Sequence, residues 1–142
     1  MNFEKLLSEG KIEKIEKTDF VSESVEKSLQ FAVKGMETES YDEVMSVVYS
    51  GIFKISSRLI NFLGYRAVGK EHHKNTFEFL KKMNINLELV DYFDNLRKKR
   101  NDFLYRDIET TTKDEAEQMI VRAREFVQEI KKFCKNFRKS ET

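Results

Sequence analysis

The absence of proline most limits what this chain can fold into. None of its 142 residues is proline and only five are glycine, so the two strongest helix breakers are almost missing. Long helices with short connections are expected, arranged as an all-α, up-and-down bundle of about five to six helices. At this length the chain fits one domain over residues 1–142, and its 12 Phe and 5 Tyr are adequate for a core.

Apolar residues at helical spacing, with turn residues between them, divide the chain into six helical segments. The expected segments are a short leading helix ending at Gly10, a helix from about Asp19 to Lys34 stopped by Gly35, one from Ser40 to Leu63 closed by Gly64, one from about His72 to Met83, one from Leu87 to about Tyr105, and a last helix after Thr112. A loosely periodic stretch, KIEKIEK, follows the leading helix.

Local signals mark some of these helices more closely. Ser40 with Glu43, and Thr112 with Glu115, match the capping box, in which a hydroxyl residue and a carboxylate three positions later satisfy the first N–H groups. Gly51 lies inside a helix, where it costs about 1 kcal/mol relative to alanine. We therefore expect another helix to pack closely against it.

Two segments carry clear apolar stripes. In the second helix the stripe consists of Phe20, Val21, Val25, Leu29, Ala32 and Val33. In the last helix it repeats at steps of four and three through Ala116, Ile120, Ala123, Val127, Ile130, Cys134 and Phe137. The second stripe fits either the interior of the bundle or a contact with a partner subunit.

Charge and hydropathy exclude some classes of protein. A net charge of +1 gives no overall attraction to nucleic acid or membrane, so any such attraction is local. No apolar run approaches a membrane span, and the N-terminus lacks the apolar core of a signal peptide. With one cysteine, Cys134, the chain is expected to be cytoplasmic. The basic clusters are Arg97–Arg100 with Arg106, and Lys131, Lys132, Lys135, Arg138 and Lys139; solvated helix faces are the simplest interpretation of both.

Arg100 interrupts an apolar helix face. Its neighbours on that face, at steps of four and three, are Leu89, Phe93, Leu96 and Phe103. A guanidinium keeps its charge, so a buried one needs a carboxylate, helix-end carbonyls, a neighbouring subunit or a bound anion such as phosphate. The alternative is an arginine that reaches the edge of the core or is held by an internal carboxylate.

The sequence around Arg100 reads DNLRKKRNDFLYR. Arg100 and Asn101, followed by Tyr105, resemble the signature of the HEPN superfamily, helical domains of prokaryotic toxins, nucleotidyltransferase partners and RNA-processing systems. Flanking residues add to the resemblance, which extends from about Phe20 to Phe133. They are Tyr49, Ile52, Phe53, Arg58, Leu59, Leu63, Gly64, Tyr65, Arg66, Gly69, His72, His73, Phe79 and Leu80.

The resemblance implies a mechanism from which this chain departs. In active members an arginine, usually followed by a polar residue, precedes a histidine by one to two helical turns. Two such motifs meet at a dimer interface and cut RNA without metal, with the ribose 2′-hydroxyl as nucleophile. Arg100 and Asn101 match this motif, but Tyr105 stands where the histidine would be.

The exchange of histidine for Tyr105 changes the chemistry that is available. Imidazole titrates near neutrality, at about 6.5, whereas a phenol titrates near about 10 and is a poor base. Binding groups remain: Arg100 for phosphate, Asn101 with a donor and an acceptor, and Tyr105 for hydrogen bonding or stacking. Arg97 of the same basic cluster is a further ligand-binding candidate.

His72 and His73 are the only histidines. Adjacent residues point about 100° apart on a helix, so the pair lacks the one-turn spacing of a helical metal site. A capping or core-edge role is the simpler interpretation. The alternative is that one of them approaches Arg100 and supplies the missing imidazole. The chain has no phosphate-binding glycine loop, Cys-x-x-Cys pair or Glu-x-x-His pattern, so no metal or cofactor is expected.

Three functions remain open from the sequence. The first is a HEPN-like, homodimeric module that binds RNA, a nucleotide or a protein such as a nucleotidyltransferase; the resemblance implies a toxin–antitoxin or defence system as its setting. The second is a metal-independent endoribonuclease with a degenerate motif, with Arg100, Asn101 and Tyr105 as catalytic candidates. The third is a purely structural helical dimer in which carboxylates enclose Arg100.

Overall fold

The computed structural model describes residues 1–104 and 111–141, and for residues 100–104 and 141 it describes the backbone alone. These described residues form six helices and two short strands. In chain order they are α1 (Glu4–Ser8), β1 (Ile12–Lys14), α2 (Glu23–Glu37), α3 (Tyr41–Phe62), β2 (Tyr65–Ala67), α4 (His72–Lys81), α5 (Leu87–Leu104) and α6 (Lys113–Glu141). The all-α prediction is confirmed.

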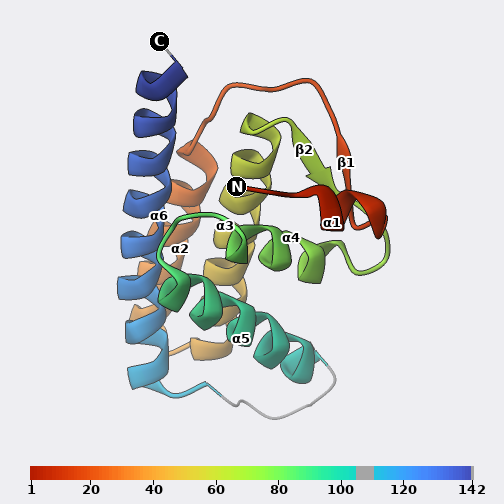
Figure 1. The fold of residues 1–142 in the computed structure, drawn as a ribbon. Helices are drawn as coiled ribbons and strands as arrows, with labels where there is room; N and C mark the ends of the chain where they lie inside the picture. Colours follow the sequence, from red (N-terminus) through yellow and green to blue (C-terminus); the bar gives the residue numbers. More distant parts are fainter. Residues whose placement is uncertain (105–110, 142) are drawn as a thin grey trace.

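The helices form two groups (Figure 1). Helices α2, α3 and α6 lie side by side, with α2 running opposite to the other two, while α4 and α5 lie across them. Helix α3 contacts α2, α4, α5, α6 and β2, so it is the central element. An up-and-down bundle implies helices that run parallel or antiparallel to one another. Helices α2, α3 and α6 have this arrangement, whereas α4 and α5 lie across them.

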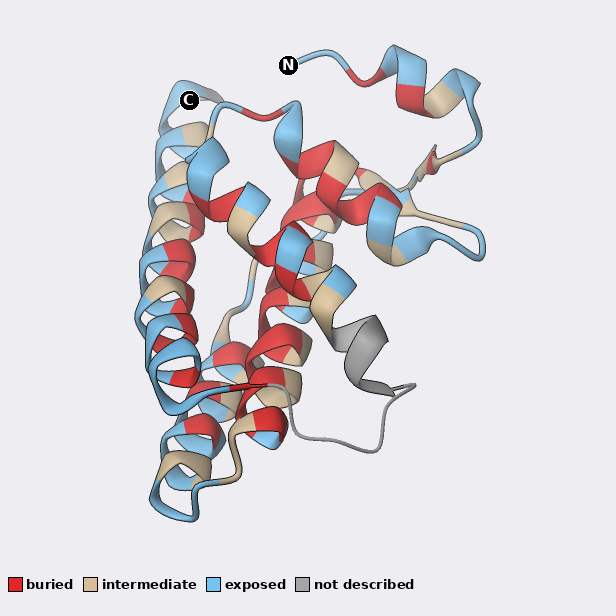
Figure 2. Ribbon diagram, turned by 90° about the horizontal axis from the view of Figure 1, so that it is seen from below, coloured by how far each residue is buried: buried red, intermediate tan, exposed pale blue. Residues whose placement is uncertain are grey.

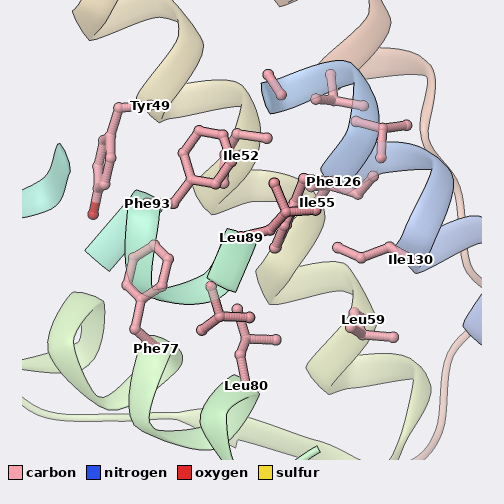
Figure 3. Packing of buried hydrophobic residues seen from close by; sticks show 14 of the residues in the cluster. Tyr49, Ile52, Ile55, Leu59, Phe77, Leu80, Leu89, Phe93, Phe126 and Ile130 are labelled. Atoms are coloured by element: carbon pink, nitrogen blue, oxygen red, sulfur yellow. The ribbon is translucent and has the colours of Figure 1, made fainter. Parts of the chain in front are cut away.

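The core is built on α3. Tyr49, Ile52, Ile55 and Leu59 of α3 are at most 1% exposed and meet buried side chains from three other helices. Figure 3 shows these partners, which are Phe77 and Leu80 of α4, Leu89 and Phe93 of α5, and Phe126 and Ile130 of α6. Figure 2 shows the complementary pattern, with exposed residues along the outward side of α6.

Two glycines allow α2 and α3 to pack closely. A Cβ on Gly51 of α3 would lie 2.8 Å from Cβ of Ser28 on α2, which confirms the close approach expected at this position. Gly35 was expected to stop α2, and that prediction was wrong. The helix continues to Glu37, and a Cβ on Gly35 would lie 2.7 Å from Cγ2 of Val44. Gly35 is therefore needed for packing, while Glu39, at φ 56°, turns the chain.

The two capping-box predictions have different outcomes. Thr112 Oγ1 accepts from the Glu115 N–H at 3.1 Å, and Glu115 Oε1 accepts from the Thr112 N–H at 3.2 Å, so the box at α6 is confirmed. At α3 the helix does begin after Ser40, but the Ser40 side chain makes no capping bond. Its hydroxyl instead lies 3.0 Å from that of Thr38. The predicted box with Glu43 was wrong because a neighbouring hydroxyl competes for Ser40.

The N-terminal segment forms a strand that the sequence did not reveal. Within KIEKIEK, β1 pairs antiparallel with β2, with Ile12 opposite Ala67 and Lys14 opposite Tyr65. Phe3, Leu6 and Ile12 are buried against the main core, and the ring of Phe3 stacks on Phe79 at 4.0 Å. The N-terminal segment therefore packs against β2 and α4. Gly64 closes α3 at φ +93°, as expected.

The stripe of α6 faces the bundle interior. Ala116, Ala123 and Ile130 are fully buried, and Cys134 is 4% exposed. The prediction of an apolar stripe on α2 was only partly correct. Helix α2 begins at Glu23, so Phe20 and Val21 precede it, and Val21 and Val33 are 43% and 39% exposed. Among the described residues, no helix has the length and apolar character needed to cross a membrane.

Candidate functional site

The motif of the candidate site lies at the C-terminal end of α5. Arg100 and Asn101 belong to this helix, but their side chains, like that of Phe103, lie outside the described residues. Tyr105 and Arg106 lie outside the described residues altogether. The contacts of these groups therefore remain predictions, and the surroundings are defined by Arg97 and by the elements packed against α5.

Arg97 is anchored by a buried carboxylate one helical turn before it. Arg97 Nε donates to Asp94 Oδ1 at 2.9 Å, and Lys81 Nζ of α4 donates to Asp94 Oδ2 at 2.6 Å. Asp94 is only 7% exposed, and burial alone would raise its pKa. The hydrogen bonds and charges of Lys81 and Arg97 outweigh burial and lower that pKa below its ordinary value. Asp94 thus stays ionised and joins α4 to α5.

Helix α4 begins at His72, as expected, and its first turn is held by several local contacts. Gly69 turns the chain at φ +92°, and Asn75 Nδ2 donates to the Val68 carbonyl at 3.0 Å. His72 Nδ1 lies 3.1 Å from the Gly69 carbonyl, which can only accept. His72 therefore carries a proton on Nδ1, and in the neutral ring Nε2 is the acceptor. The His72 side chain is exposed.

His73 is fixed by two aromatic side chains of α3. Its Nδ1 lies 2.6 Å from the hydroxyl of Tyr49, and its ring stacks on Phe53 with centroids 3.8 Å apart and planes at 8°. Tyr49 is 1% exposed, whereas His73 is half-buried. A phenol hydroxyl can donate or accept, so the hydrogen bond is compatible with both neutral tautomers of His73 and with its protonated form.

The packing of α4 on α5 relates the histidines to the motif. Lys81, at the end of α4, bonds to Asp94 in the middle of α5, and the two helices run in opposite directions (Figure 1). A helix advances about 1.5 Å per residue. His72 lies nine residues before Lys81 on α4, and an equal distance along α5 from Asp94 reaches the last turn of that helix. The first turn of α4 and the C-terminal turns of α5 therefore lie on the same side of the molecule.

A small cavity opens beside the histidines, between α3, β2 and α4. It has a volume of about 220 Å³ and is lined by Phe53, Ser57 and Asn61 of α3, Arg66 of β2, and His72 and Thr76 of α4, with Ile60 and Ala67. Sequence reasoning did not select Ser57, Asn61 or Thr76. A signal was present, because Phe53, Ser57 and Asn61 are spaced four apart and so lie along one edge of α3.

The basic clusters are partly neutralised by carboxylates. Lys99 pairs with Glu115 at the start of α6, and Lys131 Nζ lies 2.7 Å from Glu26 Oε1. Arg138 lies over the ring of Phe62 at 5.4 Å. Within the part of the chain that the structure describes, no group of three or more His, Cys, Asp or Glu side chains is arranged to hold a metal ion.

Comparison with known proteins identifies the family. The model of the HEPN domain matches residues 19–133, which agrees with the extent of the resemblance seen in the sequence. Neither the curated proteins nor the solved structures gave a match. The family match covers α2 to most of α6, including the whole of α4 and of α5, at whose C-terminal end Arg100 lies. The chain therefore belongs to the HEPN domain family.

Proposed function

We propose that this chain is an RNA-binding HEPN module whose binding surface consists of the C-terminal turns of α5 and the first turn of α4. The observation that carries the proposal is the opposed packing of these helices, fixed by the Lys81–Asp94 bond, which puts His72 and His73 on the side of the Arg100 segment. Two side chains of known geometry, Arg97 and His73, are held there by buried partners.

The proposed roles follow from the donor groups. Arg100 contacts phosphate, since a guanidinium bonds two phosphate oxygens at once. Arg97 adds positive charge; Asp94 occupies its Nε, one of five N–H donors. Asn101 and Tyr105 contact bases or sugars, and His72 and His73 supply imidazole donors. The α5 segments of two copies would meet about a two-fold axis, which would double the basic surface available to one RNA strand.

Anisotropy of a labelled single-stranded RNA, measured in EDTA, tests binding. We expect Arg100→Ala to weaken binding about tenfold to a hundredfold, because a charge-assisted hydrogen bond contributes about 1.5–3 kcal/mol. Lys98→Ala is the matched control, since Lys98 is exposed, lies two residues before Arg100 and carries the same charge. Equal loss in both variants would mean that only general charge acts and would count against a defined site at Arg100. Sedimentation equilibrium of the unmodified chain tests the dimer.

A second candidate, a metal-independent endoribonuclease, is favoured by the hydrogen bond between Tyr49 and His73. In that reaction His73 takes the proton from a ribose 2′-hydroxyl, the 2′-oxygen attacks phosphorus, and the bond to the 5′-oxygen breaks. The leaving 5′-oxygen takes up a proton from water, the protonated His73 returns its proton to the hydroxide so formed, and a 2′,3′-cyclic phosphate remains. Because Nδ1 of His73 is bonded to Tyr49, Nε2 takes the proton; Nδ1 carries a hydrogen before and after this transfer, and the hydroxyl of Tyr49 accepts it in both states.

Cleavage and binding can be measured on the same samples. The ribonuclease predicts 2′,3′-cyclic phosphate ends in EDTA, and their loss in both Arg100→Ala and His73→Asn. Asparagine keeps a polar group near the position of Nδ1, so the contact with Tyr49 is retained while the titrating ring is removed. RNA binding without any cleavage would reject the enzyme and leave the binding module.

The biological setting is part of the proposal. By resemblance to HEPN proteins encoded beside nucleotidyltransferases, the proposed setting is a toxin–antitoxin or defence system with such a partner. Co-expression with a neighbouring nucleotidyltransferase, followed by co-purification, tests this.

A purely structural dimer predicts instead that Arg100→Ala lowers stability and leaves any RNA binding unchanged.

A further inference from the structure

We propose that the cavity between α3, β2 and α4 binds one unstacked base of the RNA that the α5 surface holds. This inference rests on the proposed RNA binding and adds a site for base recognition to it. The cavity is separate from the motif itself, since its lining comes from α3, β2 and α4, with no described residue of α5.

The size of the cavity limits its ligand. Pockets for drug-sized ligands usually measure about 300–1,000 Å³, whereas this one is about 220 Å³. It can take a single heterocycle, and a sugar and phosphate would stay outside. A base that leaves the stack of a single strand is a ligand of this kind, because its backbone remains on the protein surface.

The walls offer both flat apolar surface and hydrogen-bonding groups. The ring of Phe53 meets the imidazole of His72 at 5.8 Å and 68°, which makes an aromatic corner. Ser57 and Asn61 supply a hydroxyl and an amide from the next turns of α3. Thr76 Oγ1 donates to the His72 carbonyl at 2.7 Å and can still accept. Bases need this combination, since they have two flat faces and an edge of donors and acceptors.

The charge of the lining excludes a cationic ligand. Arg66 is the only lysine or arginine among the described lining residues, and no carboxylate is among them. Arg66 is paired with Glu13 of β1, and both are exposed, so this pair stands at the rim. A neutral base joined to an anionic backbone fits such a lining better than an amine or a basic peptide.

Phe53 links the cavity to the proposed RNA surface. Its ring contacts His72, which lines the cavity, and stacks on His73, which bonds to Tyr49. His72 and His73 begin α4 on the side where the Arg100 segment ends α5. A strand whose phosphates lie on the α5 surface would therefore pass the mouth of the cavity as it crosses the first turn of α4.

A larger groove between α2 and α6 fits a base less well. It measures about 620 Å³ and is lined by Leu29, Val33 and Val127 with charged residues around them. Its described lining contains no aromatic residue, and Lys131 at its edge is paired with Glu26. Without an aromatic surface this groove offers no stacking partner, so the smaller cavity is the stronger candidate.

Filling the cavity tests the inference. Ser57→Leu adds an apolar side chain inside it, and Lys54→Leu adds the same side chain at an exposed position one turn earlier on α3. The probes are a labelled single-stranded RNA and the same RNA with abasic nucleotides. We expect the unmodified chain to prefer intact RNA by about fivefold to a hundredfold, since stacking contributes about 1–3 kcal/mol per base. Ser57→Leu should reduce this preference, because base contacts away from the cavity are unchanged, and Lys54→Leu should retain it in full.

The outcomes separate this inference from the proposed function. If the unmodified chain binds intact and abasic RNA equally, RNA binding stands and the base site is wrong. If Ser57→Leu keeps the full preference, base recognition occurs elsewhere and the cavity is again wrong. If the unmodified chain binds neither RNA, the proposed function fails together with the inference. Urea unfolding of both leucine variants confirms that they are folded.

A second measurement uses the small number of histidines. The chain has only two, so the imidazole C–H resonances of His72 and His73 can be assigned with one histidine variant. Free adenosine and uridine are the probes. At least one of them should shift the His72 resonance in the unmodified chain and in Lys54→Leu, but not in Ser57→Leu. A shift that persists in Ser57→Leu would overturn the proposed location.

Discussion

Cys134 shows how burial controls a single reactive group. Its side chain lies on the inner stripe of α6 and is 4% exposed, and burial raises the pKa of its thiol from 9.0 to about 11, with Arg138 opposing part of the shift. The thiolate is the form that reacts. At a pH below both pKa values, the buried thiol therefore has about a hundredfold less thiolate than a thiol with the ordinary pKa.

We therefore expect Cys134 to react slowly in the folded chain. At pH 8, the rate with Ellman's reagent should be at least about a hundredfold lower in the native chain than in urea, because the pKa shift and the lack of access act together. Equal rates in the two states would contradict the burial of this stripe.

Asp94 gives the fold a defined response to acid. The hydrogen bonds from Lys81 and Arg97 lower its pKa in the folded chain despite its burial. A carboxyl whose folded pKa lies below its unfolded value binds more protons when unfolded, so its contribution to stability is present at neutral pH. That contribution is lost as the pH falls from about the ordinary value of 3.8 through the lower folded pKa.

Asp94→Asn should accordingly lower the free energy of unfolding by about 1–3 kcal/mol at pH 7, and by less at pH 3. Urea titrations at the two pH values measure this difference. Asp91→Asn is the control, because Asp91 is exposed and lies 3.9 Å from the same Lys81. A loss as large at pH 3 as at pH 7 would mean that Asp94 acts through packing and not through its charge.

Among the elements, α3 and α6 begin with similar sequences but different caps. Thr112 accepts a hydrogen bond from the Glu115 N–H, whereas Ser40 makes no capping bond at α3. Thr112→Ala should therefore lower the free energy of unfolding by about 1 kcal/mol, and Ser40→Ala by only a few tenths. Thermal or urea unfolding of the two variants decides, and similar losses would show that Ser40 also caps its helix.

The contact between α2 and α3 depends on Gly51. Alanine would gain about 1 kcal/mol of helix propensity, but its Cβ would lie 2.8 Å from that of Ser28. Overpacking costs about 1–3 kcal/mol, so Gly51→Ala should be neutral or destabilising. Adding Ser28→Gly should make the double variant more stable than the sum of the two single changes predicts. Additive effects, measured by urea unfolding, would contradict the close contact.

At the scale of the whole molecule, the N-terminal segment completes the region of the cavity. Residues 1–18 precede the HEPN match, yet β1 pairs with β2, and Phe3 packs between Tyr65 and Phe79 at 5.3 and 4.0 Å. Arg66 at the rim of the cavity is paired with Glu13 of this segment. The N-terminal segment therefore supports the region of the cavity, while the residues that line the cavity come from the rest of the chain.

Phe3→Ala should release this segment. Truncation of a buried phenylalanine costs roughly 3–5 kcal/mol, so we expect amide protons of β1 and β2 to exchange faster while those of α6 keep their protection. Phe31→Ala is the control, because Phe31 is 65% exposed and its loss should change stability by about 0.5 kcal/mol or less. Unchanged exchange in β1 would contradict this role of Phe3.

The sequence by itself determined most of the helical fold and the location of the motif. The extents of α4 and α5, the cap at Thr112 and the close approach at Gly51 followed from residues only a few positions apart. Such signals act within one or two helical turns, so they can be read along the chain. The family resemblance rested in the same way on short spacings around Arg100.

Tertiary structure decided the features that join distant segments. The pairing of β1 with β2, the role of Gly35, the bonds from Lys81 and Arg97 to Asp94, and the contact between Tyr49 and His73 each depend on how one element packs against another. The cavity beside His72 likewise needs three elements at once. The periodicity of a sequence shows which face of a helix or strand is buried, but not which other element packs against that face. The packing of α3, β2 and α4 against one another defines the proposed base site.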